Sequence, residues 1–99
     1  MILKTTKIQQ SLRKKGFIEA PGGSHQKYYY HTRDNLQTSI FTFFSRGSSY
    51  TEYNDSLIGP MCKQLRISKP QFSDLIECHL SQEGYEEILK EKGLLHEDP

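Results

Sequence analysis

The sequence lacks the features that mark membrane, disulfide-bonded and metal-binding proteins. No apolar run approaches the roughly 18 to 20 residues that a bilayer span requires, and Met1-Ile2-Leu3 is too short for the apolar segment of a signal peptide. The two cysteines, Cys62 and Cys78, are too few for a disulfide framework and lack the spacing of metal ligands. We therefore expect a cytoplasmic protein with no membrane partner, whose thiols are reduced and buried or half-buried.

Motifs of nucleotide-dependent and metal-dependent enzymes are also missing. The chain contains no P-loop, dinucleotide-binding or zinc motif, and it has no internal repeat or low-complexity segment. His79 and His96 lie among acidic residues, but nothing in their spacing predicts a metal site. The sequence therefore predicts no cofactor and no metal.

Charge is distributed unevenly along the 99 residues. Residues 1–50 carry eight basic against two acidic side chains, a net charge of +6, whereas residues 51–99 carry five against ten, a net charge of −5. A basic first half is typical of a surface that meets a polyanion. With 34% hydrophobic and 25% charged residues the chain has the composition of one soluble globular domain, and RNA is the partner we expect for its first half.

Periodicity predicts a helix followed by a three-stranded antiparallel meander. The helix begins at Thr5 or Thr6 as its N-cap and runs to about Lys15, with Gly16 providing a left-handed stop. Strands follow at residues 17–20, 26–31 and 37–44, rich in aromatic and β-branched side chains. Because strand side chains alternate, Tyr28 and Tyr30 share one face and Tyr29 shares the other with Lys27. Both faces are apolar, so we expect helices on one and the C-terminal segment, a partner protein or stacked bases on the other.

Three more helices are predicted after the strands. The first begins at Asp55 or Ser56, and Pro60 is tolerable there only in the first turn. Ser68 to Gln71 form a capping-box sequence that starts the second, and Ser81 starts the last, which Gly93 ends. The sequence thus predicts an α+β fold.

His25 is the candidate reactive residue. It follows the adjacent glycines Gly22 and Gly23, where the backbone can turn sharply and its amides, with that of Ser24, can approach an anion. A histidine titrates near neutrality and suits general acid or base chemistry, and Lys27 should lie on the same face of the strand. A surface histidine without a role is the alternative interpretation.

Other residues extend the candidate site toward a polyanion. Arg46 follows the third strand and can hold a phosphate through two hydrogen bonds. Lys14 and Lys15 lie on a basic helix that can follow a phosphate backbone, although such a run is also typical of a solvated surface. Tyr28 is a substrate-binding candidate through stacking on a base, although core packing is the commoner role of such a tyrosine.

The segment Gly23-Ser24-His25-Gln26-Lys27-Tyr28 resembles the central motif of the HicA family of bacterial toxins, also called YcfA-like proteins. An amphipathic helix ending Lys-Lys-Gly-Phe before it, a hairpin after it and a helix with Lys63-Gln64-Leu65-Arg66 beyond it agree with that family. The resemblance covers roughly Ile8 to Ile67. Relatives often have a histidine or lysine near the position where this chain has Arg46. Arginine cannot shuttle a proton, so a single-histidine mechanism is expected here.

The resemblance implies both a fold and an activity. The fold is an αβββα core similar to the double-stranded-RNA-binding domain, formed by residues 1–67 and carrying a C-terminal helical extension at residues 68–99. The activity is metal-independent cleavage of mRNA by the histidine, as the toxin of a type II toxin–antitoxin pair inhibited by a HicB-like antitoxin. Two other functions remain open: an RNA-binding module of the same fold that does not cut, and a protein-interaction adaptor that ignores RNA.

Overall fold

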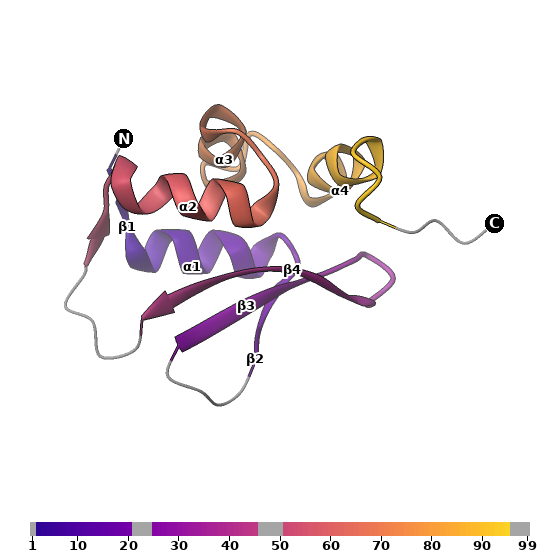
Figure 1. Cartoon of the computed structure of the whole chain (residues 1–99), viewed down its shortest axis with the longest axis horizontal. Helices are drawn as coiled ribbons and strands as arrows, with labels where there is room; N and C mark the ends of the chain where they lie inside the picture. The colour runs from indigo at the N-terminus through magenta and orange to yellow at the C-terminus, as the bar shows by residue number, and fades with distance from the viewer. Residues whose placement is uncertain (1, 21–24, 46–50, 96–99) are drawn as a thin grey trace.

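The chain forms an α+β structure with a three-stranded antiparallel sheet and four helices (Figure 1). The structure is a computed structural model that describes residues 2–20, 25–45 and 51–95, and of Ser45 only the backbone. The elements in chain order are β1 (Leu3–Lys4), α1 (Thr5–Lys14), β2 (Phe17–Ala20), β3 (His25–His31), β4 (Gln37–Ser45), β5 (Glu52–Tyr53), α2 (Asp55–Leu65), α3 (Lys69–Ile76) and α4 (Gln82–Glu91).

The main sheet is the predicted meander, with the strand order β2-β3-β4 and antiparallel pairing throughout. In its register Tyr29 faces Ile18 on one side and Phe41 on the other. The ladder between β3 and β4 is irregular between Tyr29 and His31. The pairing of β1 with β5 was not predicted, because strands of two residues are too short to show an alternating pattern.

The two faces of the main sheet have different surroundings. All four helices lie on one side of it (Figure 1). Most of the strand side chains that alternate toward that side are buried. We call this the covered face; its buried members are Phe17, Tyr28, Tyr30, Ile40, Thr42 and Phe44. No described element crosses the opposite side, which we call the open face; it consists of Ile18, Ala20, His25, Lys27, Tyr29, Phe41 and Phe43.

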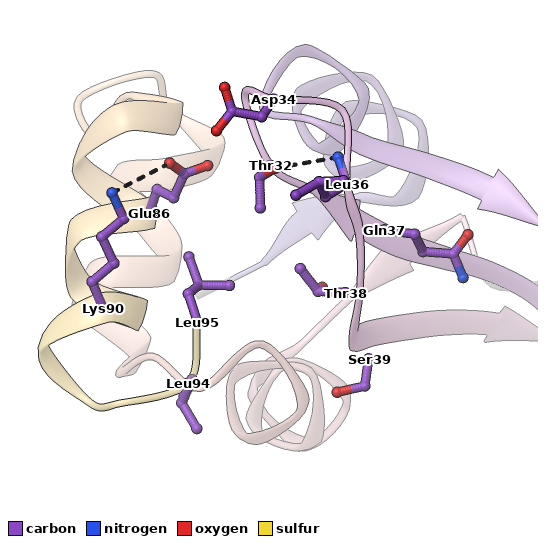
Figure 2. Close-up of a pocket in the computed structure, with 10 residues that line it drawn as sticks. All are labelled: Thr32, Asp34, Leu36, Gln37, Thr38, Ser39, Glu86, Lys90, Leu94 and Leu95. Atoms are coloured by element: carbon purple, nitrogen blue, oxygen red, sulfur yellow. Dashed lines mark hydrogen bonds and ion pairs between the residues drawn. The ribbon is translucent and has the colours of Figure 1, made fainter. Parts of the chain in front are cut away.

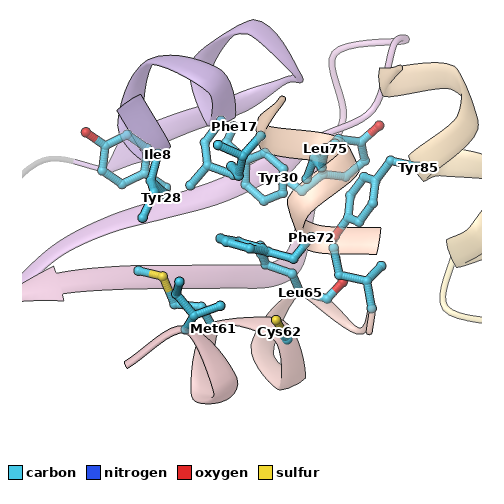
Figure 3. Close-up of a cluster of buried hydrophobic side chains, with 14 of the residues drawn as sticks. Ile8, Phe17, Tyr28, Tyr30, Met61, Cys62, Leu65, Phe72, Leu75 and Tyr85 are labelled. Carbon is cyan, nitrogen blue, oxygen red and sulfur yellow. Dashed lines mark hydrogen bonds between the residues drawn. The ribbon is translucent and has the colours of Figure 1, made fainter. Parts of the chain in front are cut away.

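One hydrophobic core joins the covered face to all four helices (Figure 3). Phe72 and Leu75 of α3 and Tyr85 of α4 have no exposed surface, and they belong to the same cluster as Phe17 and Tyr30 of the sheet. Fully burying one such apolar side chain contributes on the order of 1.5 to 3 kcal/mol. The last two helices are therefore part of the core and do not cover the open face.

Several helix boundaries confirm the sequence predictions. The Ser68 hydroxyl accepts a hydrogen bond from the Gln71 amide, and the Gln71 side chain accepts one from the Ser68 amide, which completes the capping box. Gly16 ends α1 with a φ of 95°. A Cβ there would lie 2.8 Å from the carbonyl oxygen of His31, so glycine is required by conformation and by space.

Two expectations about helices were wrong. The N-cap of α1 is Lys4, whose side chain makes no capping hydrogen bond, and Thr5 is already helical. Pro60 lies in the second turn of α2, because the helix begins at Asp55 behind the N-cap Asn54. Proline has no amide to donate to the carbonyl of Ser56. Both residues are exposed, so water can satisfy that carbonyl and the helix continues.

The two cysteines have different environments. Cys62 is a buried core residue, as expected, and burial raises the pKa of its thiol. Cys78 is exposed, which corrects the expectation that both thiols are buried or half-buried. It follows the last turn of α3 with a φ of 65°, beyond the part of the helix whose side chains are buried in the core. Among residues 2–20, 25–45 and 51–95, no helix is long and apolar enough to cross a bilayer.

Candidate nucleic-acid interface

His25 is the first residue of β3 and lies on the open face. Its ring packs against that of Phe43, with the centroids 5.0 Å apart and the planes inclined by 51°. The Nδ1 atom is buried and has no hydrogen-bond partner within the described ranges. Most buried polar atoms in proteins are hydrogen-bonded, so an imidazole nitrogen left without a partner marks this side chain as unusual.

Lys27 lies two residues further along β3 on the same face, as the alternation predicts. Its Nζ atom lies 5.8 Å from the centroid of the Phe41 ring, in the geometry of a cation–π contact. The side chain is exposed, and it has no ion pair with any carboxylate in the described part of the chain. Its positive charge is therefore available to an anionic ligand.

Aromatic rings occupy the rest of the open face. Tyr29 and Phe41 are stacked across the strand pair, with centroids 5.0 Å apart and an interplanar angle of 26°. Both rings are half-buried, as is Phe43, and Ile18 beside Tyr29 is 49% exposed. The open face thus combines an apolar, mainly aromatic surface with two nitrogen bases and no acidic side chain.

Other predicted contacts are not on this face. Tyr28 is fully buried on the covered face, where its hydroxyl accepts a hydrogen bond of 2.9 Å from Arg13. Stacking of Tyr28 on a base is therefore wrong, because the ring already packs edge-on against Phe44 in the core. Lys15 is only 9% exposed at the end of α1, so it is not a surface cation.

The basic helix α1 is largely neutralised by other parts of the chain. Lys7 donates to both carboxylate oxygens of Glu77 at 2.8 and 3.0 Å. Arg13 lies 3.9 Å from Glu19 in addition to its bond to Tyr28. Lys14 is exposed, but α1 lies on the helical side of the sheet and Lys14 borders a groove between α1 and α3. The structure therefore does not bring Lys14 together with His25.

The remaining candidate residues cannot be placed. Gly22, Gly23, Ser24 and Arg46 lie outside the described residues. Within the described ranges, the predicted site is therefore represented by His25 and Lys27. The sequence assigned no role to Phe41 and Phe43 beyond placing them on the face opposite Ile40 and Phe44, and their alternation with those residues was the available signal.

A polar cluster around Glu86 joins α4 to the hairpin between β3 and β4. This buried carboxylate accepts hydrogen bonds from the Tyr30 hydroxyl at 2.9 Å and from the Arg33 amide at 3.0 Å, and Arg33 Nε lies 3.5 Å away. Burial alone would raise the pKa of Glu86, but the hydrogen bonds from Arg33 and Tyr30 and the Arg33 charge outweigh it and lower the pKa. Sequence patterns could not reveal this cluster because its members are more than fifty positions apart.

A pocket lies beside this cluster, between the hairpin and α4 (Figure 2). Its volume is about 650 Å³, and its lining combines the apolar Leu36, Leu94 and Leu95 with the carboxylates of Asp34 and Glu86. It adjoins the end of β3 opposite to His25. Lys90 also lines the pocket, but two carboxylates against one amine leave a net negative lining that does not favour a phosphate backbone.

Comparison with protein-family models, with curated proteins and with solved structures found no match for this chain. The resemblance to the HicA family is thus carried by the motif from Gly23 to Tyr28 and by the order of the surrounding elements. The described residues also contain no group of three or more metal-ligating side chains.

Proposed function

We propose that the protein is an endoribonuclease in which His25 acts as the general base, and that it is the toxin of a HicAB-like pair. The observation that supports this most strongly is the position of His25 at the edge of the open face, with Lys27 beside it on the strand. The proposal includes the αβββα fold similar to the double-stranded-RNA-binding domain, formed here by α1, the three strands and α2.

The proposed reaction is an internal transfer at phosphorus. Neutral His25 takes the proton from a ribose 2′-OH while its oxygen forms a bond to the adjacent phosphorus, and the bond from phosphorus to the 5′ oxygen breaks. The leaving 5′ oxygen takes up a proton from water, and protonated His25 returns its proton to the solvent, which leaves a 5′-hydroxyl end and a 2′,3′-cyclic phosphate. Lys27 would stabilise the charge that develops on the phosphate oxygens. Arg46 and the amides of Gly22 to Ser24 would assist there, as the sequence suggests.

The first test compares wild type with His25→Ala on an end-labelled RNA in the presence of a chelator. A positioned general base is worth roughly 10²- to 10⁴-fold in rate, so we expect His25→Ala to lose at least about a hundredfold in cleavage. The wild-type products should end in 2′,3′-cyclic phosphate, and the all-deoxy strand should remain intact. Cleavage of the deoxy strand, or loss of wild-type activity on chelation, would contradict the mechanism.

His79→Ala is the matched control for this experiment. His79 is exposed after the end of α3, where its Nδ1 lies 3.9 Å from Asp74, and it is not part of the open face. Its substitution should leave the cleavage rate unchanged. Equal losses in both histidine variants would point to a general loss of structure or to a contaminating nuclease.

A non-catalytic RNA-binding module is the second candidate function. It is favoured by the rings and the free cation of the open face, which do not depend on His25 for binding. If wild type and His25→Ala bind RNA equally and neither cuts it, this candidate replaces the enzyme. If neither variant binds RNA at any salt concentration, the adaptor function is the remaining alternative.

A further inference from the structure

We infer that the open face binds unpaired nucleotides, whose bases stack on the rings around Tyr29 and Phe41 while Lys27 holds the backbone. The inference deepens the proposed function by naming single-stranded RNA as the substrate class. It rests on that function only for the choice of RNA as ligand, because stacking and charge pairing do not require cleavage.

The first argument is the chemistry of the face. Tyr29, Phe41 and Phe43 are half-buried in a sheet that no described helix covers, so part of each ring is open to solvent. A surface of aromatic rings beside a cation is how proteins hold single strands, because every base has a flat face that can stack. Bases inside a duplex are already stacked on one another and cannot reach such a surface.

The second argument is the distribution of charge. Glu19 of β2 is the one acidic residue in the three described strands of the main sheet, and it points to the opposite side, toward Arg13. Lys27, in contrast, is exposed, and its amine lies near the Phe41 ring with no carboxylate partner among the described residues. Apolar rings alone would suit a peptide as well as a base. A face with a cation and no acid is complementary to a phosphate backbone.

The third argument concerns the basic helix α1, which is the alternative surface for binding RNA. A duplex would have to be held by the basic helix α1, the element with the highest density of cations in the sequence. Lys7 is bound to Glu77, Arg13 is engaged by Tyr28 and Glu19, and Lys15 is buried. Lys14 is then the one cation between residues 5 and 15 that is exposed without a partner among the described residues. This helix is poorly suited to follow a duplex backbone.

The test measures binding of a labelled single-stranded RNA and of the same strand annealed to its complement. It uses His25→Ala, so that the strand is not consumed if the protein cuts it. We expect the unpaired strand to bind more tightly than the duplex, and Phe41→Leu and Tyr29→Leu each to weaken its binding about tenfold, since one stacked base is worth on that order. Leucine retains apolar bulk, so the fold should persist; the near-ultraviolet and far-ultraviolet circular dichroism checks this. Phe41→Trp should bind at least as well as the parent.

Two matched controls separate the open face from the rest of the surface. Leu36→Ala removes an exposed apolar side chain from the hairpin end of the molecule and should not change the affinity. Lys27→Gln should weaken binding and reduce its salt dependence, whereas Lys14→Gln should do neither. Duplex bound as tightly as single strand, with a larger effect of Lys14→Gln than of Lys27→Gln, would overturn the inference in favour of the helix.

The proposed cleavage and the inferred stacking of bases can be contradicted independently of each other. Wild type that binds through the rings but leaves the RNA intact would contradict the proposed nuclease and leave this inference standing. Cleavage that depends on His25 but is insensitive to Phe41→Leu and Tyr29→Leu would support the proposed nuclease and contradict this inference. An absence of RNA binding in all variants, combined with a polypeptide that protects Tyr29 and Phe41 from solvent, would show that the open face is a protein interface and would overturn the inference.

Discussion

Tyrosine side chains occur on both the covered and the open face of the sheet, but in different environments. Tyr28, Tyr29 and Tyr30 are consecutive in β3, so alternation places the outer two on the covered face and the middle one on the open face. The hydroxyls of Tyr28 and Tyr30 have polar partners in Arg13 and Glu86, and burial raises the pKa of both hydroxyls. Tyr29 has a ring neighbour, Phe41, and no hydrogen bond to its hydroxyl among the described residues.

This difference separates the contacts that stabilise the fold from the surface that we propose as the RNA-binding site. On the covered face every large ring is packed on several sides, and its polar atoms are satisfied inside the protein. On the open face the rings pack against each other along the strands and leave surface and charge available. Substitutions on the two faces should therefore affect different measurements.

The largest expected effect on stability is the loss of a buried tyrosine ring from the covered face, measured against the loss of Tyr29 from the open face. Tyr30→Ala removes a fully buried ring and its bond to Glu86, and comparable truncations cost about 3 to 5 kcal/mol in the free energy of unfolding. Tyr29→Ala removes a half-buried ring with one stacked neighbour, which is worth about 1 kcal/mol or less. Urea unfolding followed by circular dichroism measures both values.

The corresponding phenylalanine variants remove the hydroxyl groups alone. Tyr30→Phe should lose about 1.5 to 3 kcal/mol, because the buried carboxylate of Glu86 loses a donor. Tyr29→Phe should be close to wild type. Equal losses in Tyr30→Ala and Tyr29→Ala would mean that the open face is covered in solution and that the distinction between the faces is wrong.

A smaller effect is expected from the pH dependence of the covered side. The pKa of Glu86 is lowered in the folded state, so its contribution to stability is present above its unfolded pKa of about 4.3 and is lost as pH falls through the folded pKa. The charged and titratable groups that face it are Tyr30, Arg33 and Lys90. Glu86→Gln should flatten the acid limb of the curve of unfolding free energy against pH.

Lys27→Gln provides the matched open-face variant for this measurement. Its charge has no partner among the described carboxylates, so the acid limb should match that of wild type. An acid limb unchanged by Glu86→Gln would show that the carboxylate is not held in the polar cluster. The docking of α4 onto the hairpin would then rest on apolar contacts alone.

Local patterns in the sequence predicted most of this architecture. The alternation of residues 26–31 and 37–44 was sufficient to assign Tyr28 and Tyr29 to opposite faces, and the Ser68 and Gly16 signals located two helix ends correctly. The pairing of β1 with β5 and the cluster around Glu86 depend on residues that are distant in sequence, so no local pattern contains them. The assignment of Tyr28 to substrate failed because aromatic side chains occur on both faces and only the packing of α1 and α2 decides which face is open.

The candidate site could be predicted less completely than the fold. His25 and Lys27 lie on one face as expected, because that depends only on alternation. Lys7 pairs with Glu77, and Arg13 donates a hydrogen bond to the Tyr28 hydroxyl and lies 3.9 Å from Glu19. Spacing along α1 could not indicate these contacts, because the partners belong to other elements. We therefore expect RNA to contact the aromatic open face of the sheet and not the basic helix α1.

The most direct test of the role of the open face is to locate the RNA contact on the protein by NMR. Isotope-labelled His25→Ala is titrated with single-stranded RNA, and the change in chemical shift is followed for each backbone amide and aromatic ring. We predict the largest changes at Lys27, Tyr29, Phe41 and Phe43. Changes concentrated at Lys7 and Lys14 of α1, with the open face unaffected, would contradict the account.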